Sequence, residues 1–401
     1  MTFYYLILFL VIFSLSLLEA LQIAFIRKTA PLIVCALFFI TAGFRYETGV
    51  DWMTYSMIFK RTAPVSEIGT IIGREKIFIE PDLGYILLAS IVKWLGGGIQ
   101  TIFLIISFLT SVFIYKSLKK YAKNATLSLL LYYCLIFFFL DMSGMRQGLS
   151  LAIFFYSLSF VYERRFVPFI LCIFLAALFH WSSIMLIPLY FVLQAKLRNW
   201  FVLSSVFLSL LMFFLNIKWL TSIVVFLLPY LTGNSSLIGK AIVYTTEESF
   251  ASGWKVNLSM ILNVVFSIIM LLLLLIFRKR LSVRFRYYNL FLNVYVLQLL
   301  IYFSFSELLE VAERMKLYFV IGNIVLLPYL IGTVRRLSLK VGVTVLIALY
   351  GAIGSRAYLL ERPATIAYHP YQNYIVYKAL DLRSTGKERL KEHYRIFESY
   401  K

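Results

Sequence analysis

Charged residues are scarce in this 401-residue chain, in which Asp, Glu, Lys and Arg together make up 14%. Soluble domains average about 25% charged and about 45–50% apolar residues, whereas 61% of this chain is hydrophobic. This balance excludes an ordinary water-soluble protein, and the high hydrophobicity excludes a disordered one. The apolar runs are too continuous for an outer-membrane barrel, whose strands alternate over about 10 residues. We therefore expect an all-α, polytopic integral membrane protein.

Acidic residues, cysteines and histidines are scarcer still. The chain has 19 Asp and Glu against 39 Lys and Arg, but the cations are scattered between apolar runs, so we predict no nucleic-acid partner. Its three cysteines and three histidines lie far apart, and no pair has metal-ligand spacing. No Walker-type loop or dinucleotide fingerprint appears. We therefore expect neither a metal nor a cofactor.

Long apolar runs are what the chain has in abundance. A spanning helix needs about 20 mostly apolar residues, and about twelve spans (eleven to fourteen) are predicted. The two short runs at 166–179 and 182–194 have an alternative, a helical hairpin that does not fully cross. Pieces 83–95 and 218–231 are interpreted as interfacial or re-entrant helices. The candidate spans are 3–26, 30–44, 99–115, 125–140, 145–162, 166–179, 182–194, 200–216, 257–277, 287–304, 315–334 and 341–358.

The charges orient these spans. Every second loop of the twelve-span arrangement carries a Lys and Arg cluster, as cytoplasmic loops do, and the other loops hold nearly all the acids. This parity predicts one transmembrane domain over 1–358, with external loops at 45–98 and 232–256, and places both termini outside. The tail, 359–401, is itself net basic, so its outside placement depends only on the alternation of basic and acidic loops along the chain. The long loops on the outer side indicate a function at the outer leaflet.

The first outer segment, 43–55, combines a cation, carboxylates and aromatic rings at the membrane surface. Arg45 could clamp a phosphate, Asp51 could accept a proton from a sugar hydroxyl, and Tyr55 could stack on a sugar. The alternative is an aromatic interfacial belt with a solvated salt bridge. Glu80, next to Pro81, adds a second carboxylate, unless it only marks a helix start.

Arginines also open two later spans. Arg146 and Gln147 lie on the first turn of the fifth span, where an arginine is costly and suggests function; a pairing with Asp141 is the structural alternative. Arg314 opens the eleventh span and could be a second phosphate ligand, or it could form an ion pair with Glu310.

His180 lies between two apolar runs, where it could carry a proton, donate to an oxyanion or simply pack. Taken together, arginines at outer helix ends beside carboxylates and aromatics fit a site for a membrane-anchored pyrophosphate and a sugar. Cations would neutralise the leaving diphosphate while a base deprotonates the attacking hydroxyl.

At these residues the chain resembles the EpsG family of bacterial exopolysaccharide proteins, a branch of the Wzy-type polysaccharide polymerases. The resemblance covers most of the chain up to about residue 320. The matching pieces, in the order of the family, are Gly43-Phe44-Arg45-Tyr46, Gly49, Asp51 to Tyr55, Glu80-Pro81, Arg146-Gln147-Gly148, Phe179-His180 with Ser183, and Glu313-Arg314 to Tyr318-Phe319.

The resemblance implies a metal-independent glycosyltransferase with a GT-C-like helical fold, in the bacterial inner membrane, with its site facing the periplasm or exterior. Its substrates would be undecaprenyl-pyrophosphate-linked oligosaccharides. Its expected partners would be the lipid bilayer, a chain-length regulator and a flippase of the same pathway. The alternatives are a transporter or flippase of lipid-linked oligosaccharide and a non-catalytic partner of a polysaccharide synthase.

The roles within such a site are hypotheses. Asp51 or His180 is the expected base, and Arg146 and Arg314 are the expected diphosphate ligands. Arg45 and Glu80 are expected to order the acceptor sugar. The expected substrate-binding side chains also include Tyr55, Gln147 and Tyr318.

Overall fold

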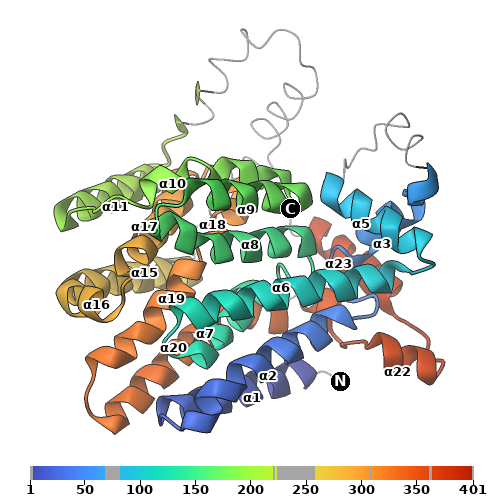
Figure 1. The fold of residues 1–401 in the computed structure, drawn as a ribbon, viewed down its shortest axis with the longest axis horizontal. Helices are drawn as coiled ribbons and strands as arrows, with labels where there is room; N and C mark the ends of the chain where they lie inside the picture. The colour runs from blue at the N-terminus through green and yellow to red at the C-terminus, as the bar shows by residue number, and fades with distance from the viewer. Residues whose placement is uncertain are drawn as a thin grey trace. The chain divides into compact units, whose positions relative to one another are not determined.

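The computed structural model describes residues 3–67, 82–219, 222–223, 258–307, 309–360 and 364–399 (Figure 1). In these ranges the regular structure is helical, and a single isolated bridge joins Arg45 to Asn373. The all-α prediction is therefore confirmed for this part of the chain. The chain divides into two compact units, each described by itself. The first combines Met1–Phe191 with Leu327–Lys401, and the second is Val192–Leu326.

Several helices mark a membrane protein. Within the described ranges, three are long and apolar enough to cross a bilayer: α2 (Ala24–Gly43), α6 (Ile99–Tyr121) and α20 (Leu337–Leu359). A fourth candidate is the pair α15 (Leu258–Ile276) and α16 (Arg278–Arg284), bent by 72°. The shorter apolar helices are Tyr4–Ala20, Leu83–Trp94, Ala125–Phe137, Phe166–Phe179, Trp181–Val192, Asn199–Phe214, Tyr288–Ser304 and Ile321–Thr333. The count of twelve spans and the single transmembrane domain remain predictions.

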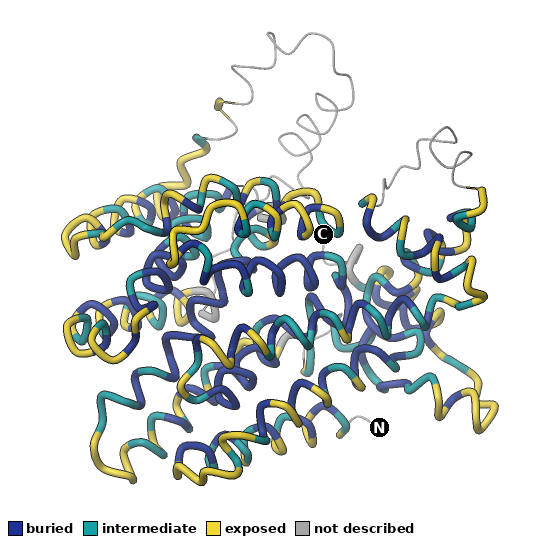
Figure 2. Tube along the Cα trace, viewed as in Figure 1, coloured by how far each residue is buried: buried dark blue, intermediate teal, exposed yellow. Residues whose placement is uncertain are grey.

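The first unit is built around α8 (Met145–Tyr162). Helix α6 packs between α2 and α8, and α9 (Phe166–Phe179) packs on α8 (Figure 1). Most of α8 is buried (Figure 2). Its sequence intersperses glycine, serine and alanine among large apolar residues, which lets neighbouring helices approach closely on every side.

Two predicted spans are shorter than hydropathy suggests. Helix α9 has 14 residues and is about 21 Å long, less than the roughly 30 Å hydrocarbon core. The run 182–194 forms the 3₁₀ segment η3 (Trp181–Leu186) and the short α10 (Leu189–Val192), with Pro188 between them. This pair favours the helical-hairpin alternative.

The predicted span 125–140 is irregular. Helix α7 (Ala125–Tyr132) continues into the π-helical segment η2 (Tyr133–Phe137). The first turn of α7 is capped by Glu19 at the end of α1 (Tyr4–Ala20): its carboxylate oxygens accept from the Ala125 amide at 3.0 Å and the Thr126 amide at 2.7 Å. The acid that lies deepest in a predicted span is therefore held as a helix cap.

The tail packs on the segment that follows α2. The Tyr46 amide donates to the Gln372 carbonyl at 2.8 Å, and the Tyr374 amide donates to the Phe44 carbonyl at 2.7 Å. The tail and the first loop therefore lie at the same end of the unit, whichever face of the membrane that is. The other elements of the first unit are α3 (Trp52–Arg61), η1 (Val65–Glu67), α5 (Leu83–Trp94), η5 (Ile331–Thr333), α21 (Ala364–Tyr368), α22 (Tyr374–Ala379) and α23 (Gly386–Ser399).

In the second unit, α17 (Tyr288–Ser304) packs against α11 (Asn199–Phe214) and α18 (Leu309–Leu317), and α19 (Ile321–Leu330) crosses the boundary between the units. The Tyr288 hydroxyl donates to the Leu274 carbonyl at 2.6 Å, and the Tyr295 hydroxyl donates to the Ser267 carbonyl at 2.8 Å. These bonds tie α17 to α15.

Candidate functional site

Three segments remote in sequence meet at Asp82, at the start of α5. Its Oδ2 lies 2.9 Å from Arg146 Nη1 and 4.0 Å from His180 Nδ1. Its Oδ1 accepts a hydrogen bond from the Trp181 amide at 2.9 Å. We call Asp82, Arg146, His180 and the Trp181 amide the Asp82 cluster. It joins two residues that the sequence singled out separately.

A glycine makes this meeting possible. At Gly84, in the first turn of α5, an added Cβ would lie 2.7 Å from the Leu178 carbonyl oxygen. Only glycine lets α5 approach the end of α9 so closely. The chain then leaves α9 in an extended conformation at His180 (φ −152°, ψ 101°). Asp82 precedes α5 but makes no side-chain cap there, and its carboxylate reaches across to Trp181 instead.

The Asp82 cluster is largely shielded from solvent. The side chains of Asp82 and Arg146 are 12% and 18% exposed. Burial raises the pKa of the Asp82 carboxyl above its usual range, and the Trp181 amide and the Arg146 charge offset only part of this rise. The Nε of Arg146 is buried and makes no hydrogen bond within the described residues. The cluster therefore offers a positioned guanidinium with an unsatisfied donor.

Two tyrosines support Arg146. Its guanidinium carbon lies 5.7 Å from the ring centroid of Tyr55 and 5.9 Å from that of Tyr85. Both rings are buried, and the Tyr85 hydroxyl donates to the Tyr55 carbonyl at 3.3 Å. Tyr55 packs inside the unit and supports the arginine, and its expected stacking on a sugar stays a prediction. Asp51, which precedes α3, interacts electrostatically with the Tyr55 hydroxyl, so it flanks the same pair.

Arg45 is an internal brace. It is 1% exposed, and its Nη1 donates to the Ala42 carbonyl at 2.7 Å and to the Asp141 carbonyl at 2.9 Å. Its guanidinium carbon lies 4.2 Å above the Phe103 ring, and Nη2 lies 3.5 Å from Met145 Sδ. In these contacts Arg45 fixes the residue immediately before Arg146. The expected contact with a sugar stays a prediction.

The loops before α3 and α8 interlock. Gly49 has φ +99°, and a Cβ there would lie 2.1 Å from the Met142 carbonyl oxygen. The Val50 amide donates to the Ser143 hydroxyl at 2.9 Å. The position of Asp51 is therefore fixed relative to the start of α8, where Arg146 lies.

Arg146 does form an ion pair, but with Asp82, so the predicted pairing with Asp141 is wrong. Both Asp141 carboxylate oxygens accept from the Tyr132 hydroxyl, at 2.9 and 3.0 Å. Asp82, which directly follows Glu80 and Pro81 in the sequence, was not among the predicted site residues. Glu80 itself lies outside the described residues.

The other predicted site residues are placed as follows. Gln147 is buried beside Arg146 on α8. Arg314 is exposed on α18, and Tyr318 is buried just after that helix, both in the second unit. Their roles stay predictions, and the side chain of Glu310 is outside the described part of the chain. Among the described residues, no three His, Cys, Asp or Glu side chains gather as a metal site would require.

The tail holds the first loop, a role that no sequence signal revealed. Arg389 on α23 donates to the carbonyls of Pro370 and Glu47, both at 3.0 Å. The Ser384 hydroxyl donates to Glu47 Oε2 at 2.6 Å. The loop that leads to Asp51 is therefore clamped by the tail.

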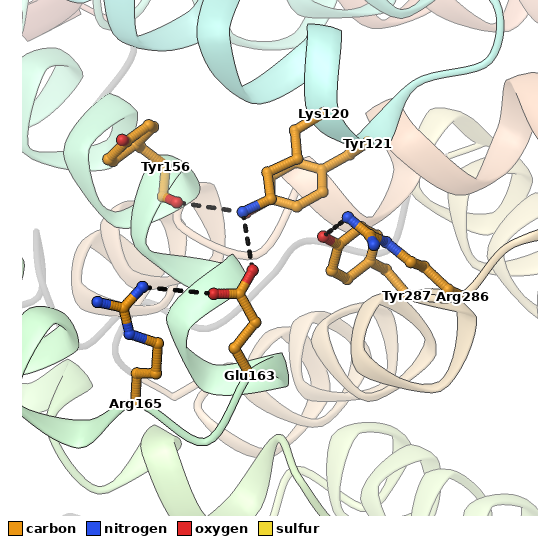
Figure 3. Close-up of polar contacts among 7 residues, drawn as sticks. All are labelled: Lys120, Tyr121, Tyr156, Glu163, Arg165, Arg286 and Tyr287. Carbon is orange, nitrogen blue, oxygen red and sulfur yellow. Dashed lines mark hydrogen bonds and ion pairs between the residues drawn. The ribbon is translucent and has the colours of Figure 1, made fainter.

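The other end of α8 carries an ion-pair group that serves as a comparison. Glu163 accepts from Lys120 at 3.1 Å and lies 3.8 Å from Arg165 (Figure 3). Glu163 follows Arg146 by 17 residues along α8, a rise of about 26 Å. All three side chains of the Glu163 group are between 32% and 59% exposed, unlike the Asp82 cluster.

A model of the EpsG family matches residues 28–373. The matched range includes Asp51, the whole Asp82 cluster and Arg314, and it ends before α23. No curated protein and no solved structure matches the chain.

Proposed function

The chain belongs to the EpsG family, and from this premise we propose that it is a membrane-embedded polysaccharide polymerase. Membership gives the coarser statement, a membrane protein of polysaccharide biosynthesis. The finer proposal is a glycosyltransferase that joins undecaprenyl-pyrophosphate-linked oligosaccharides at the outer face of the plasma membrane and releases undecaprenyl pyrophosphate. The main support for this glycosyltransferase proposal is the Asp82 cluster, in which a guanidinium, a carboxylate and an imidazole lie together, shielded from solvent, at one end of the first unit.

Arg146 is the proposed ligand of the diphosphate. As the bond between the anomeric carbon and the phosphate oxygen breaks, negative charge grows on the leaving pyrophosphate. A cation that is already fixed stabilises this charge without reorganising. Asp82 and the two tyrosine rings fix Arg146, and its Nε is left with a donor to offer. Arg314 is the proposed second cation.

His180 is the proposed base, with Asp51 as the alternative. The acceptor hydroxyl oxygen bonds to the anomeric carbon of the growing chain, its proton passes to the base, and the lipid pyrophosphate leaves with the electrons of the broken bond. Asp82 lies 4.0 Å from His180 Nδ1, so it would orient the ring and leave Nε2 toward the acceptor. We place Asp82 and Arg45 as positioning residues, and Glu80, Tyr55, Gln147 and Tyr318 in the surroundings of the sugars.

We also propose the fold and orientation expected from the sequence, with about twelve spans in a GT-C-like arrangement and the Asp82 cluster facing the exterior. The proposed partners are a flippase and a chain-length regulator. A flippase is the alternative function for the chain itself. Transporters place ionisable residues near the bilayer midplane. The deepest acid, Glu19, caps α7, and this observation favours the polymerase.

Reconstitution tests the proposal. The full chain in liposomes, supplied with lipid-linked repeat units and EDTA but no nucleotide, is expected to form a polymer ladder. Arg146→Ala and His180→Ala should abolish it. Arg165→Ala, an arginine in the exposed Glu163 group (59% exposed), is the matched control and should leave it unchanged. Movement of the oligosaccharide across the bilayer without new glycosidic bonds would instead identify a flippase.

A further inference from the structure

A basic cavity lies within the second unit. It has a volume of about 720 Å³ and is formed by the residues just before α11 and by the bend between α15 and α16. Its lining includes four cations, Lys196, Arg198, Arg278 and Lys279, and the apolar residues Leu275 and Ile276. No part of the Asp82 cluster lines this cavity.

One of the four cations builds the cavity. Arg278 Nη1 donates to the Leu197 carbonyl and to Asn199 Oδ1, both at 2.7 Å, and Nη2 donates to Asn289 Oδ1 at 3.0 Å. These bonds join the start of α11 to the start of α16 and to α17. Asn293 on α17 holds the preceding segment by donating to the Leu193 and Ala195 carbonyls at 3.1 and 2.7 Å. The walls are therefore fixed before any ligand arrives.

The other three cations form no ion pair with any residue that the structure describes. Lys196, Arg198 and Lys279 are all exposed. Neither 192–218 nor 258–306 contains an acidic residue. In the first unit, by contrast, Glu163 neutralises Lys120 and Arg165 (Figure 3). Cations that have no ion-pair partner among the described residues, placed around a preformed cavity, favour the binding of an anion there.

The start of α11 adds to the positive potential. Arg198 precedes this 16-residue helix and makes no side-chain cap. The first-turn amides lie at the positive end of the helix dipole, which is the usual place for a phosphate.

The surroundings indicate a lipid as the source of that phosphate. Helix α16 turns by 72° from the apolar α15, so when α15 crosses the bilayer α16 lies close to the membrane plane. Ile276 and Trp200, beside the cavity, are 72% and 64% exposed, and Val283 on α16 is 88% exposed. Such side chains face acyl chains and the interface, and tryptophan prefers the headgroup level.

We propose that this cavity binds the phosphate headgroup of an anionic membrane lipid, with Lys196, Arg198 and Lys279 as its ligands and Leu275 and Ile276 against its acyl chains. The site lies among basic loops, so it belongs to the cytoplasmic leaflet by the positive-inside rule. It is independent of the polymerase proposal, because none of its residues acts in the proposed reaction.

Native mass spectrometry of the full chain in detergent tests this site, with phosphatidylglycerol and phosphatidylcholine titrated as probes. We expect one phosphatidylglycerol to bind preferentially and the triple variant K196Q/R198Q/K279Q to weaken that binding at least about tenfold. The matched control K116Q/K123Q/R164Q, three exposed cations near the C-terminal ends of α6 and α8 in the first unit, should bind as wild type. Should the triple variant elute as aggregate, Lys279→Gln alone is measured, with roughly a threefold loss expected.

Two results would overturn the proposal. One is equal affinity for phosphatidylcholine and phosphatidylglycerol, or unchanged binding in a folded variant. The other is displacement of the lipid by millimolar inorganic phosphate, which would identify a site for a free anion. Retention of the lipid under phosphate, together with loss in the variant, supports the lipid site.

Discussion

Replacing Asp82 by asparagine separates the charge of the Asp82 cluster from its shape. Asparagine keeps the size of the side chain, and its Oδ1 can still accept from the Trp181 amide, now 2.9 Å away. What disappears is the ion pair with Arg146 and the negative charge 4.0 Å from His180 Nδ1. The fold should therefore survive while the cation and the imidazole lose their orientation.

The size of the effect follows from burial. Exposed ion pairs contribute about 0–1 kcal/mol, whereas removing one partner of a fully buried pair costs about 3–5 kcal/mol. The two side chains here are 12% and 18% exposed, so we expect about 2–3 kcal/mol. If that energy holds Arg146 and His180 in the geometry of the transition state, kcat/KM should fall roughly 30- to 160-fold.

The assay is the initial rate of polymer formation by the reconstituted full chain, at protein levels matched by quantitative immunoblot. Glu163→Gln is the matched control, since it removes a carboxylate from the more exposed pairs with Lys120 and Arg165. We expect less than about threefold change there. In the double variant with Arg146→Gln the losses should not add, because the two residues act as one pair. A folded Asp82→Asn protein with wild-type rate, or fully additive losses, would refute this reasoning.

Three further predictions concern packing and pH. Gly84→Ala should lower the thermal midpoint in detergent and reduce polymer formation, because the Cβ of the new alanine would lie 2.7 Å from the Leu178 carbonyl oxygen. We expect about 1–3 kcal/mol of destabilisation. An unchanged midpoint would contradict the close approach of α5 to the end of α9. Glu19→Ala should destabilise the folded protein by about 1–2 kcal/mol, because the substitution leaves two α7 amides uncapped. The kcat of the protein that remains folded should change little. A selective loss of kcat would contradict this structural role and indicate that Glu19 carries a proton. Burial raises the pKa of Asp82, so its ionised form is lost as pH falls at a pH above the usual value of about 3.9, and polymerisation should decline there. Protonation of the proposed base also lowers the rate at acid pH, so Asp82→Asn should change the acid side of the pH–rate profile without abolishing the decline. An identical profile would count against the role of Asp82.

The fold class and the main segments of the site were predictable because they depend on composition and on local pattern. Long apolar runs require helices in a membrane, and an arginine such as Arg146 at a helix end is costly enough to suggest a function. Hydropathy alone could not show that the run 182–194 forms short 3₁₀ and α-helical pieces around Pro188. It records how apolar the run is and leaves its backbone conformation open.

The choice of carboxylate could not be predicted. In Glu80-Pro81-Asp82 either acid could face Arg146 by sequence, and the answer depends on α5 packing against α9 at Gly84. That contact is made with a backbone carbonyl, which leaves no side-chain pattern in the sequence.

Arg45 shows the same limitation. An arginine at a helix end indicates a phosphate ligand, but its partners here are the Ala42 and Asp141 carbonyls and the Phe103 ring. The tail likewise reaches the first loop mainly through the main chain, at Tyr46 and Tyr374. Contacts with backbone atoms are set by tertiary packing, so neither the role of Arg45 nor the packing of the tail could be predicted from residue types.

The most direct test of the central claim counts products. Purified wild-type chain in liposomes is given lipid-linked repeat units with EDTA, and new glycosidic bonds and released undecaprenyl pyrophosphate are quantified together. We expect one lipid pyrophosphate to be released for each bond formed, with both products lost in Arg146→Ala and retained in Arg165→Ala. Bonds formed equally well by Arg146→Ala, or transfer of substrate across the bilayer with no bond and no released pyrophosphate, would contradict it.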